Sequence, residues 1–224
     1  MPYVACADDN RPRSAVGFAV KSGWAAAVLL IGSSTSPRLV DSRRIDLSDP
    51  AIPESRQPYH AGFGTARDGG AALTRLVRSV RRFGRRSVRD AVKTYAAEER
   101  PLTAAGLVVG SLIDPNRIAN QHIRIHALEG QLFREVVEQA LAASGLRCSM
   151  WRARDLYGAA VERLGRPESQ IRSKVALLGH GIDGSWRAEQ KAAAVAAWLV
   201  LAAPGRAASS TRKLRFGSNP KDAG

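Results

Sequence analysis

Two histidines and a glutamate are spaced so that one helix would present them together. His122, His126 and Glu129 lie four and three residues apart, which places their side chains on one face of an α-helix. Imidazole and carboxylate groups arranged in this way could bind Zn²⁺ or another transition metal. Nothing else in the sequence completes a known metal signature, so a structural, hydrogen-bonding role is favoured. We assign no metal ligand from the sequence and leave the question open.

A second group of reactive side chains is in residues 48–70, a segment rich in proline and glycine. Its centre contains Arg56, Tyr59 and His60, whose side chains can bind phosphate, stack on bases and move protons. Structureless loops of roughly twenty residues are uncommon in compact domains unless they are functional or disordered. Two interpretations remain: the loop carries function, or Tyr59 and His60 fold it back onto the sheet.

Lys21 is the one charged residue in the apolar stretch of residues 15–31. This stretch consists of two strand-like runs separated by a Ser-Gly turn, a pattern typical of a β-hairpin. Lys21 therefore lies near the carboxyl end of the first strand, where open α/β sheets bind ligands. A buried lysine without a partner is costly, so we expect it to pair with Glu129 or Glu189.

Basic residues recur every three or four positions along a helical segment between about residues 73 and 98, opposite an apolar face. This basic stripe consists of Arg75, Arg78, Arg82, Arg85, Arg89 and Lys93. Phosphate contacts by such a stripe would give sequence-independent, salt-sensitive nucleic-acid binding, whereas the alternative is a solvated basic face without a ligand. Gly84 marks a point at which the helix could kink.

The chain has 224 residues and a formal net charge of +14. Such an excess favours anionic partners such as nucleic acid or phosphorylated ligands, although richness in arginine and alanine can also follow from genomic base composition. We expect neither a membrane span nor a signal peptide, and hence no membrane partner. Two cysteines are too few for a disulfide framework or a metal quartet, which favours a cytoplasmic location.

The order of the apolar runs predicts three antiparallel strands, a helix or pair of helices, a buried strand, a long helix, another strand and further helices. One domain over residues 14–203 accounts for these elements. We expect residues 1–13 to form a flexible leader. Residues 204–224 carry five basic residues and one acidic residue with little apolar content, which predicts a disordered basic tail.

This order of elements resembles the ribonuclease H-like fold, and the last two thirds of the chain are similar to its RuvC and YqgF branch. The similar patches are Gly106-Leu107-Val108-Val109-Gly110, His126-Ala127-Leu128-Glu129-Gly130, Ile171-Arg172-Ser173-Lys174-Val175 with Gly179-His180-Gly181, and the alanine-rich helix of residues 186–201. The resemblance implies an α/β fold with a mixed five-stranded sheet, in which three antiparallel strands come first and two parallel strands follow, flanked by helices.

The same resemblance implies a nuclease site from which this sequence departs. RuvC-type nucleases hold two Mg²⁺ ions with four carboxylates from the first strand, the fourth strand and the final helix. The corresponding positions here fall at Ala19, Val20 or Lys21, at Gly110 or Ser111, and at Glu189 with Trp186 one turn earlier. A lysine near the metal position would repel Mg²⁺, so we interpret the metal-binding carboxylates as degenerate.

Two interpretations of function follow. In the first, the chain is a ribonuclease H-like domain that lacks the usual two-metal site and binds nucleic acid or a phosphorylated ligand. In the second, it is a hydrolase or nuclease with an altered site, in which His60 is a general acid or base, Glu129 and Glu189 assist it, and Mg²⁺ or Mn²⁺ serves as cofactor. The predicted ligand-binding residues are Lys21, Ser22, Arg56, Tyr59, Asn116, His122 and Lys191.

Geometry separates these interpretations. Because the carboxyl ends of the first, third and fourth strands open on one edge of this fold, the Lys21 turn, residues 48–70 and residues 114–122 should meet there. An enzyme further predicts that the three catalytic candidates share one concave pocket. A third interpretation, in which apolar helices carry contacts to a partner such as a second copy in a homodimer, is also open.

Overall fold

The computed structural model describes most of the chain, namely residues 13–62, 65–67, 69–97, 102–182 and 184–203. The predicted leader and tail lie outside these ranges, except that Arg13 forms part of the first strand instead of the leader. None of the helices in these ranges combines the length and apolar character that a membrane span requires.

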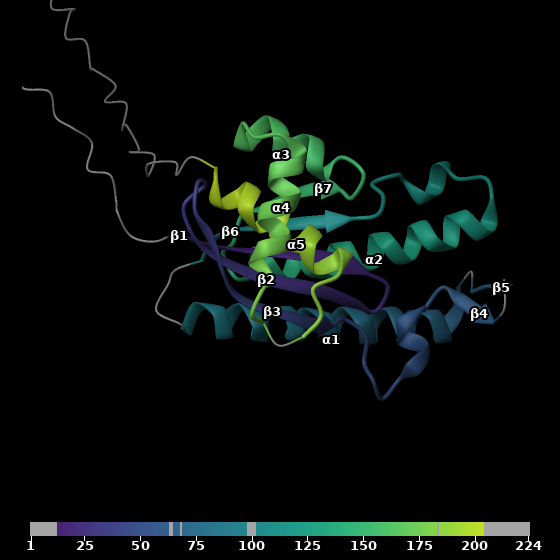
Figure 1. Cartoon of the computed structure of the whole chain (residues 1–224). Coiled ribbons are helices and arrows are strands. Elements are labelled where there is room, and N and C mark those ends of the chain that lie inside the picture. Colours follow the sequence, from purple (N-terminus) through teal and green to yellow (C-terminus); the bar gives the residue numbers. More distant parts are fainter. Residues whose placement is uncertain (1–12, 63–64, 68, 98–101, 183, 204–224) are drawn as a thin grey trace, which may run out of the picture.

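A mixed sheet of five strands forms the centre of the fold, in the order β3-β2-β1-β6-β7 (Figure 1). Its strands are β1 (Arg13–Lys21), β2 (Trp24–Gly32), β3 (Pro37–Asp46), β6 (Leu102–Val109) and β7 (Cys148–Arg152). β1, β2 and β3 are antiparallel neighbours, whereas β6 runs parallel to β1 and β7 runs parallel to β6. This confirms the predicted sheet of three antiparallel strands followed by two parallel ones.

The hairpin predicted around Lys21 is present. β1 pairs with β2 up to Lys21 opposite Trp24, and Ser22 and Gly23 make the turn. Gly23 has φ of +81°, a left-handed conformation that glycine reaches without the steric cost of a Cβ. The middle of both strands is buried, because helices cover both faces of the sheet. This explains why neither strand alternates between apolar and polar residues.

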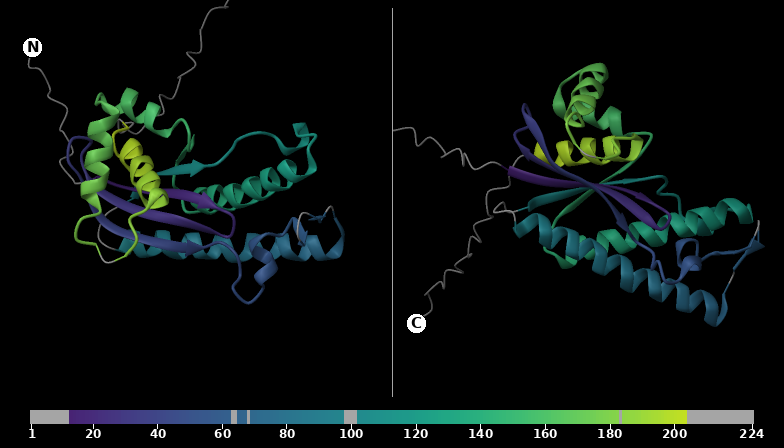
Figure 2. Two further views of the ribbon diagram at one scale, coloured as in Figure 1. Left: turned by 45° about the vertical axis from the view of Figure 1, so that its right-hand side comes forward. Right: turned by 60° about the horizontal axis from the view of Figure 1, so that its bottom comes forward.

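Two long helices, α1 (Gly70–Ala97) and α2 (Gln121–Ala143), cover one face of the sheet (Figure 2). Their buried side chains share a core with those of β1, β2 and β6. α1 continues through Gly84, so the segment forms one helix and not a pair. A Cβ at Gly84 would lie 2.7 Å from Val136 Cγ1 and 2.9 Å from the Leu47 carbonyl oxygen. The glycine therefore allows α1 and α2 to pack closely.

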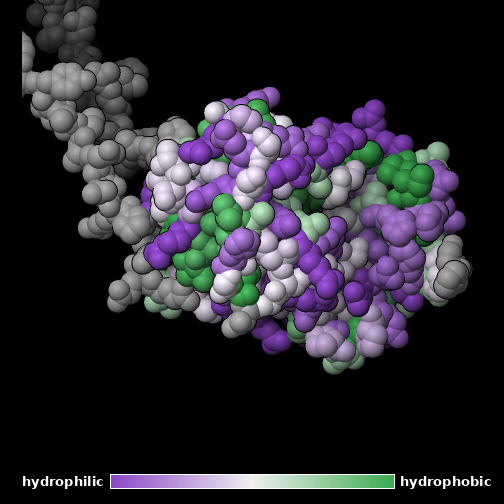
Figure 3. Space-filling view, viewed as in Figure 1, coloured by the Kyte–Doolittle hydropathy of each residue, from purple (hydrophilic) through white to green (hydrophobic). Residues whose placement is uncertain are grey.

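The helices on the other face are α5 (Ala188–Leu201), α3 (Leu156–Leu164) and α4 (Glu168–Leu178) (Figure 2). Two indole hydrogen bonds hold this layer in place, one to the turn between β2 and β3 and one to α4 within the layer. Trp198 Nε1 donates to the Ser34 carbonyl oxygen at 2.8 Å, and Trp186 Nε1 donates to that of Val175 at 2.9 Å. The face of the molecule drawn in Figure 3 is mostly hydrophilic, because apolar side chains are enclosed in the two cores.

Glycines on two neighbouring strands bring α5 against the sheet. A Cβ at Gly17 would lie 1.9 Å from the Ala193 carbonyl oxygen, and one at Gly106 would lie 2.5 Å from the Ala196 carbonyl oxygen. Both contacts are to the α5 backbone, which cannot rotate away as a flexible side chain could. The missing side chains therefore set the distance between helix and sheet.

Short elements, and not a structureless loop, connect β3 to α1. They are the 3₁₀ helix η1 (Pro53–Arg56) and the antiparallel pair β4 (His60–Gly62) and β5 (Thr65–Ala66). The Arg67 N–H donates to the Tyr59 carbonyl oxygen at 2.8 Å, and Arg67 Nη1 donates to that of Pro58 at 2.9 Å. Since β5 contacts α2, this hairpin holds Tyr59 and His60 beside that helix.

Cys148, at the start of β7, is expected to react slowly with thiol reagents. Burial, and to a smaller degree the charge of Glu138, raises the pKa of the Cys148 thiol to about 11. The thiolate is the reactive form, and at about pH 8 roughly 0.1% of such a thiol is ionised. In a Cys6→Ser variant, we expect the native protein to react with a disulfide reagent roughly a hundredfold more slowly than the urea-unfolded chain. Equal rates would contradict a half-buried thiol of raised pKa.

Candidate functional site

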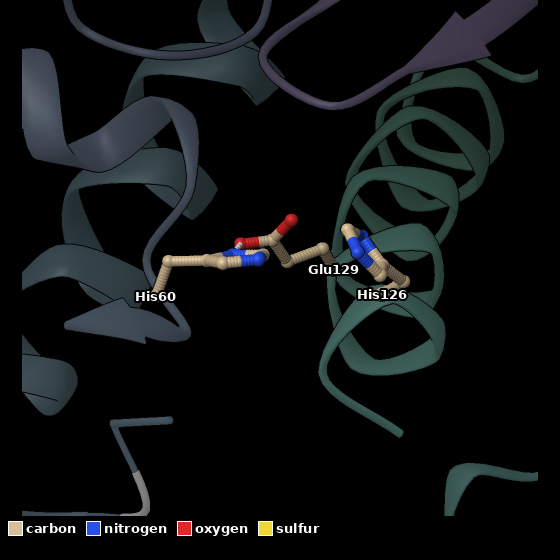
Figure 4. Close-up of side chains that lie close together, drawn as sticks. All are labelled: His60, His126 and Glu129. Carbon is tan, nitrogen blue, oxygen red and sulfur yellow. Dashed lines mark hydrogen bonds and ion pairs between the residues drawn. The ribbon is translucent and has the colours of Figure 1, made fainter. Parts of the chain in front are cut away.

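The imidazoles of His60 and His126 and the carboxylate of Glu129 meet beside α2 (Figure 4). His60 Nδ1 and Glu129 Oε1 are hydrogen-bonded at 2.8 Å, although 69 positions separate the two residues. The ring centroids of His60 and His126 are 5.1 Å apart. One ligand atom of each residue lies within 4.8 Å of the other two. In the described ranges, no other group of three His, Cys, Asp or Glu side chains has metal-ligand spacing.

Helix α2 supplies two members of this cluster and brings His122 beside it. Asn120 caps the helix by accepting a hydrogen bond from the Ile123 N–H, so α2 starts just before His122. His122 Nε2 lies 3.3 Å from His126 Nε2, and both side chains are exposed. The predicted shared face of His122, His126 and Glu129 is thus present in part, and His60 joins it from the β4 hairpin.

Glu129 has an unusual environment for a carboxylate. Its side chain is fully buried, and Oε2 has no hydrogen-bond partner within the described part of the chain. The pKa of Glu129 is raised above its usual range, because burial disfavours the charged carboxylate. The hydrogen bond and charge of His60, the charge of His126 and the backbone of Tyr59 lower the pKa, but by less than burial raises it. A buried carboxylate of this kind favours a proton or a cation as its partner.

Lys21 pairs with Glu189 and not with Glu129. Lys21 Nζ lies 3.3 Å from Glu189 Oε1 at the start of α5. The expectation of a buried lysine is wrong, because 51% of the Lys21 side chain is accessible where β1 ends in the turn. The pKa of Glu189 is lowered, mainly by a hydrogen bond from its own backbone N–H. Burial opposes this lowering in part, and the hydrogen bond and charge of Lys21 add to it. Lys191, two positions further along α5, is half-buried.

A cavity of about 310 Å³ opens where β1 and β6 end. Its polar lining comes from Lys21, Ser22, Ser111 and His126, and most of its remaining lining is apolar. None of the described residues that line it is Asp or Glu. Ile118 also lines it, so the predicted meeting of the Lys21 turn with residues 114–122 is confirmed.

In the segment before α1, some side chains line open pockets and Tyr59 also packs against the core. Arg56 and His60 line an open pocket of about 580 Å³, while Tyr59 and Asn116, the latter in η2 (Pro115–Arg117), line another of about 280 Å³. Tyr59 packs against the core, and burial raises the pKa of its phenol. The loop therefore folds back through Tyr59 as one interpretation holds, whereas His60 is bound to α2. Of the three catalytic candidates, His60 and Glu129 are together and Glu189 is with Lys21.

An open groove of about 1020 Å³ follows the seam between α1 and α2. The cations that line it are Arg78, Arg81, Arg82, Arg85 and Arg89. Four of these belong to the predicted basic stripe, whereas Arg75 and Lys93 are exposed on α1 without lining the groove. Arg81 was missed, although its spacing of three and four residues from Arg78 and Arg85 places it on the same helix face. Arg85 also donates a hydrogen bond to Gln139 of α2.

Solved structures match the fold. No protein-family model and no curated protein matches the chain. Thermus thermophilus RuvC in complex with a Holliday junction substrate aligns with a TM-score of 0.51 and 9% identity, over 84% of this chain and 91% of that chain. Another structure of Thermus thermophilus RuvC aligns with a TM-score of 0.48 and 10% identity, over 83% and 92% of the two chains. A Ppx/GppA family member from Aquifex aeolicus aligns with a TM-score of 0.36 and 8% identity, over 68% and 40%.

At such low identity the likeness concerns the fold alone. The strand order, the directions of the strands and the match to the RuvC complex agree with one another. The chain has the ribonuclease H-like fold.

Proposed function

We propose that this protein is a ribonuclease H-like domain that binds nucleic acid through the arginine groove between α1 and α2, without the two-Mg²⁺ chemistry of RuvC-type nucleases. The observation that carries the proposal is the set of five arginines that line one groove. Guanidinium groups stay charged at physiological pH and bind phosphate oxygens through paired N–H donors. The net charge of +14 would add long-range attraction for a polyanion.

The length of the groove favours a polymer over a small phosphorylated ligand. Arg78 and Arg89 are eleven residues apart on one continuous helix, which corresponds to about 16 Å along its axis. One strand of duplex DNA rises about 3.4 Å per phosphate, so several successive phosphates fit this length. Thermus thermophilus RuvC, which has the same fold, is known in complex with a Holliday junction substrate. That precedent supports nucleic acid as the ligand class.

The residues at the carboxyl ends of β1 and β6 do not fit a pair of Mg²⁺ ions. Mg²⁺ takes oxygen ligands and commonly carboxylates, whereas the cavity there is lined by Lys21 and Ser111, with no acidic side chain among its described lining residues. Glu189 already pairs with the Lys21 ammonium group. A cation at this position would repel a divalent metal, so we derive no metal-assisted cleavage step at this edge.

A binding titration with a cleavage control tests the proposal. We expect labelled duplex and four-way-junction DNA of mixed sequence to bind at low salt, with an affinity that falls by roughly two orders of magnitude between about 50 and 200 mM salt. Millimolar Mg²⁺ or Mn²⁺ should produce no cleavage. Absent or salt-insensitive binding would contradict the nucleic-acid assignment, and metal-dependent products would contradict the loss of two-metal chemistry.

A further inference from the structure

We propose that His60, His126 and Glu129 bind one transition-metal ion, with Zn²⁺ as the first choice, through side chains other than those at the strand positions where RuvC-type nucleases hold Mg²⁺. This inference does not depend on the proposed nucleic-acid function. It concerns side chains from β4 and α2, whereas the groove is lined by α1 and the carboxyl-terminal half of α2.

The first observation is the spacing of the donor atoms. Zn–N and Zn–O bonds are about 2.0 to 2.1 Å long, so two ligand atoms of a tetrahedral ion lie roughly 3.3 Å apart. His60 Nδ1 and Glu129 Oε1 are 2.8 Å apart, and donor atoms of all three residues lie within 4.8 Å of one another. Small side-chain rotations would therefore suffice to bring the three donors onto one ion.

The second observation is independent of the spacing and concerns Glu129 Oε2. This oxygen belongs to a fully buried side chain and has no hydrogen-bond partner within the described ranges. An unpaired buried carboxylate oxygen is costly, and buried charges in proteins are commonly paired or bound to metals. A bound cation would neutralise the carboxylate inside the fold.

The donor types indicate a transition metal and not Mg²⁺ or Ca²⁺. Two imidazoles and one carboxylate suit Zn²⁺ and related ions, whereas Mg²⁺ and Ca²⁺ take oxygen ligands. Three protein ligands leave a fourth position on a tetrahedral ion, which in other sites with two histidines and one glutamate holds water or substrate. His122, whose Nε2 lies 3.3 Å from His126 Nε2, is the nearest further imidazole. Because His126 also lines the cavity where β1 and β6 end, the site is next to space that a small molecule could enter.

Metal titration of the purified full chain without a polyhistidine tag tests this site. We expect one Zn²⁺ per chain by calorimetry and elemental analysis, a rise in melting temperature on binding, and visible absorption typical of tetrahedral coordination when Co²⁺ replaces Zn²⁺. Glu129→Gln and His126→Gln should each lower the affinity for Zn²⁺ by more than roughly 100-fold. Losing a residue that only hydrogen-bonds to a metal ligand costs roughly 10- to 100-fold, and losing a ligand should cost more. His180→Gln is the matched control, because His180 belongs neither to the three proposed ligands nor to the adjacent His122, and this variant should bind Zn²⁺ like the wild type.

Glu129→Gln separates loss of the site from loss of the fold. Glutamine keeps the shape and can still hydrogen-bond to His60, so circular dichroism and DNA binding should remain those of the wild type while Zn²⁺ binding is lost. The metal site would be refuted if the wild type bound no Zn²⁺, or if the folded Glu129→Gln variant bound it with unchanged affinity. Either result would leave salt-sensitive DNA binding intact, so it would be distinguished from failure of the proposed function.

Discussion

Replacing Gly17 with alanine is expected to lower the free energy of unfolding by about 3 kcal/mol or more, or to prevent folding altogether. The added Cβ would lie 1.9 Å from the Ala193 carbonyl oxygen and 2.8 Å from the Ala197 backbone nitrogen. Neither atom can move without shifting α5, whose last ten residues are all buried except the half-buried Ala192. Because small domains are stable by only about 5 to 15 kcal/mol, the loss would be large.

Gly158→Ala provides the matched control for this substitution. Gly158 lies within α3, and a Cβ there would meet no atom within 4 Å. Alanine in a helix is favoured over glycine, so this variant should be as stable as the wild type or more stable by up to about 1 kcal/mol. Urea unfolding followed by circular dichroism measures both. If Gly17→Ala unfolded at the wild-type urea concentration, close packing of α5 on β1 would be wrong.

The second large expected effect is on nucleic-acid affinity. Replacing Arg78 and Arg82 together with glutamine should weaken DNA binding by roughly a hundredfold at about 0.1 M salt, because each lost phosphate contact removes nearly a tenfold gain from counterion release. Both side chains are exposed in the groove, so the fold should be unaffected. Fluorescence anisotropy with labelled duplex measures the change.

A double variant on the opposite face of the sheet controls for net charge. Arg154→Gln with Arg163→Gln removes the same amount of positive charge. Both positions are exposed: Arg154 lies just before α3 and Arg163 lies within it. Helix α3 packs with α5 on the face of the sheet away from the groove. The Arg154 ion pair with Asp155 is exposed, so its loss should change stability little. We expect this variant to bind DNA within a few-fold of the wild type. Equal weakening by both variants would mean that total charge, and not the groove, governs binding.

Local patterns in the sequence were sufficient for the first hairpin and for four of the five arginines in the groove, whereas the mixed five-stranded sheet was implied by the family resemblance. Two apolar runs around a Ser-Gly turn predicted the β1–β2 hairpin, and arginines every three or four residues predicted the basic face of α1. These features depend on neighbours along the chain, so periodicity reports them directly. Arg81 fits the same spacing and could have been included.

Contacts between distant segments could not be predicted in the same way. The pairing of His60 with Glu129 depends on how the β4 hairpin crosses α2, and no pattern within residues 48–70 indicates that path. Lys21 was expected to be buried because its neighbours are apolar, yet it is the last residue of β1 and extends to solvent. Gly84 was predicted only as a point at which the helix could kink, whereas both Gly17 and Gly84 mark close contacts with elements far along the chain.

The dependence of DNA affinity on salt, compared between the wild type and the Arg78→Gln, Arg82→Gln variant, tests the central claim most directly. Each duplex phosphate contact contributes about 0.9 to the slope of log affinity against log salt, so the variant should have a slope shallower by roughly 1.8. The variant with both substitutions near α3 should keep the wild-type slope. Identical slopes for the groove variant and the wild type would show that these arginines do not contact phosphate, and would contradict binding through the groove.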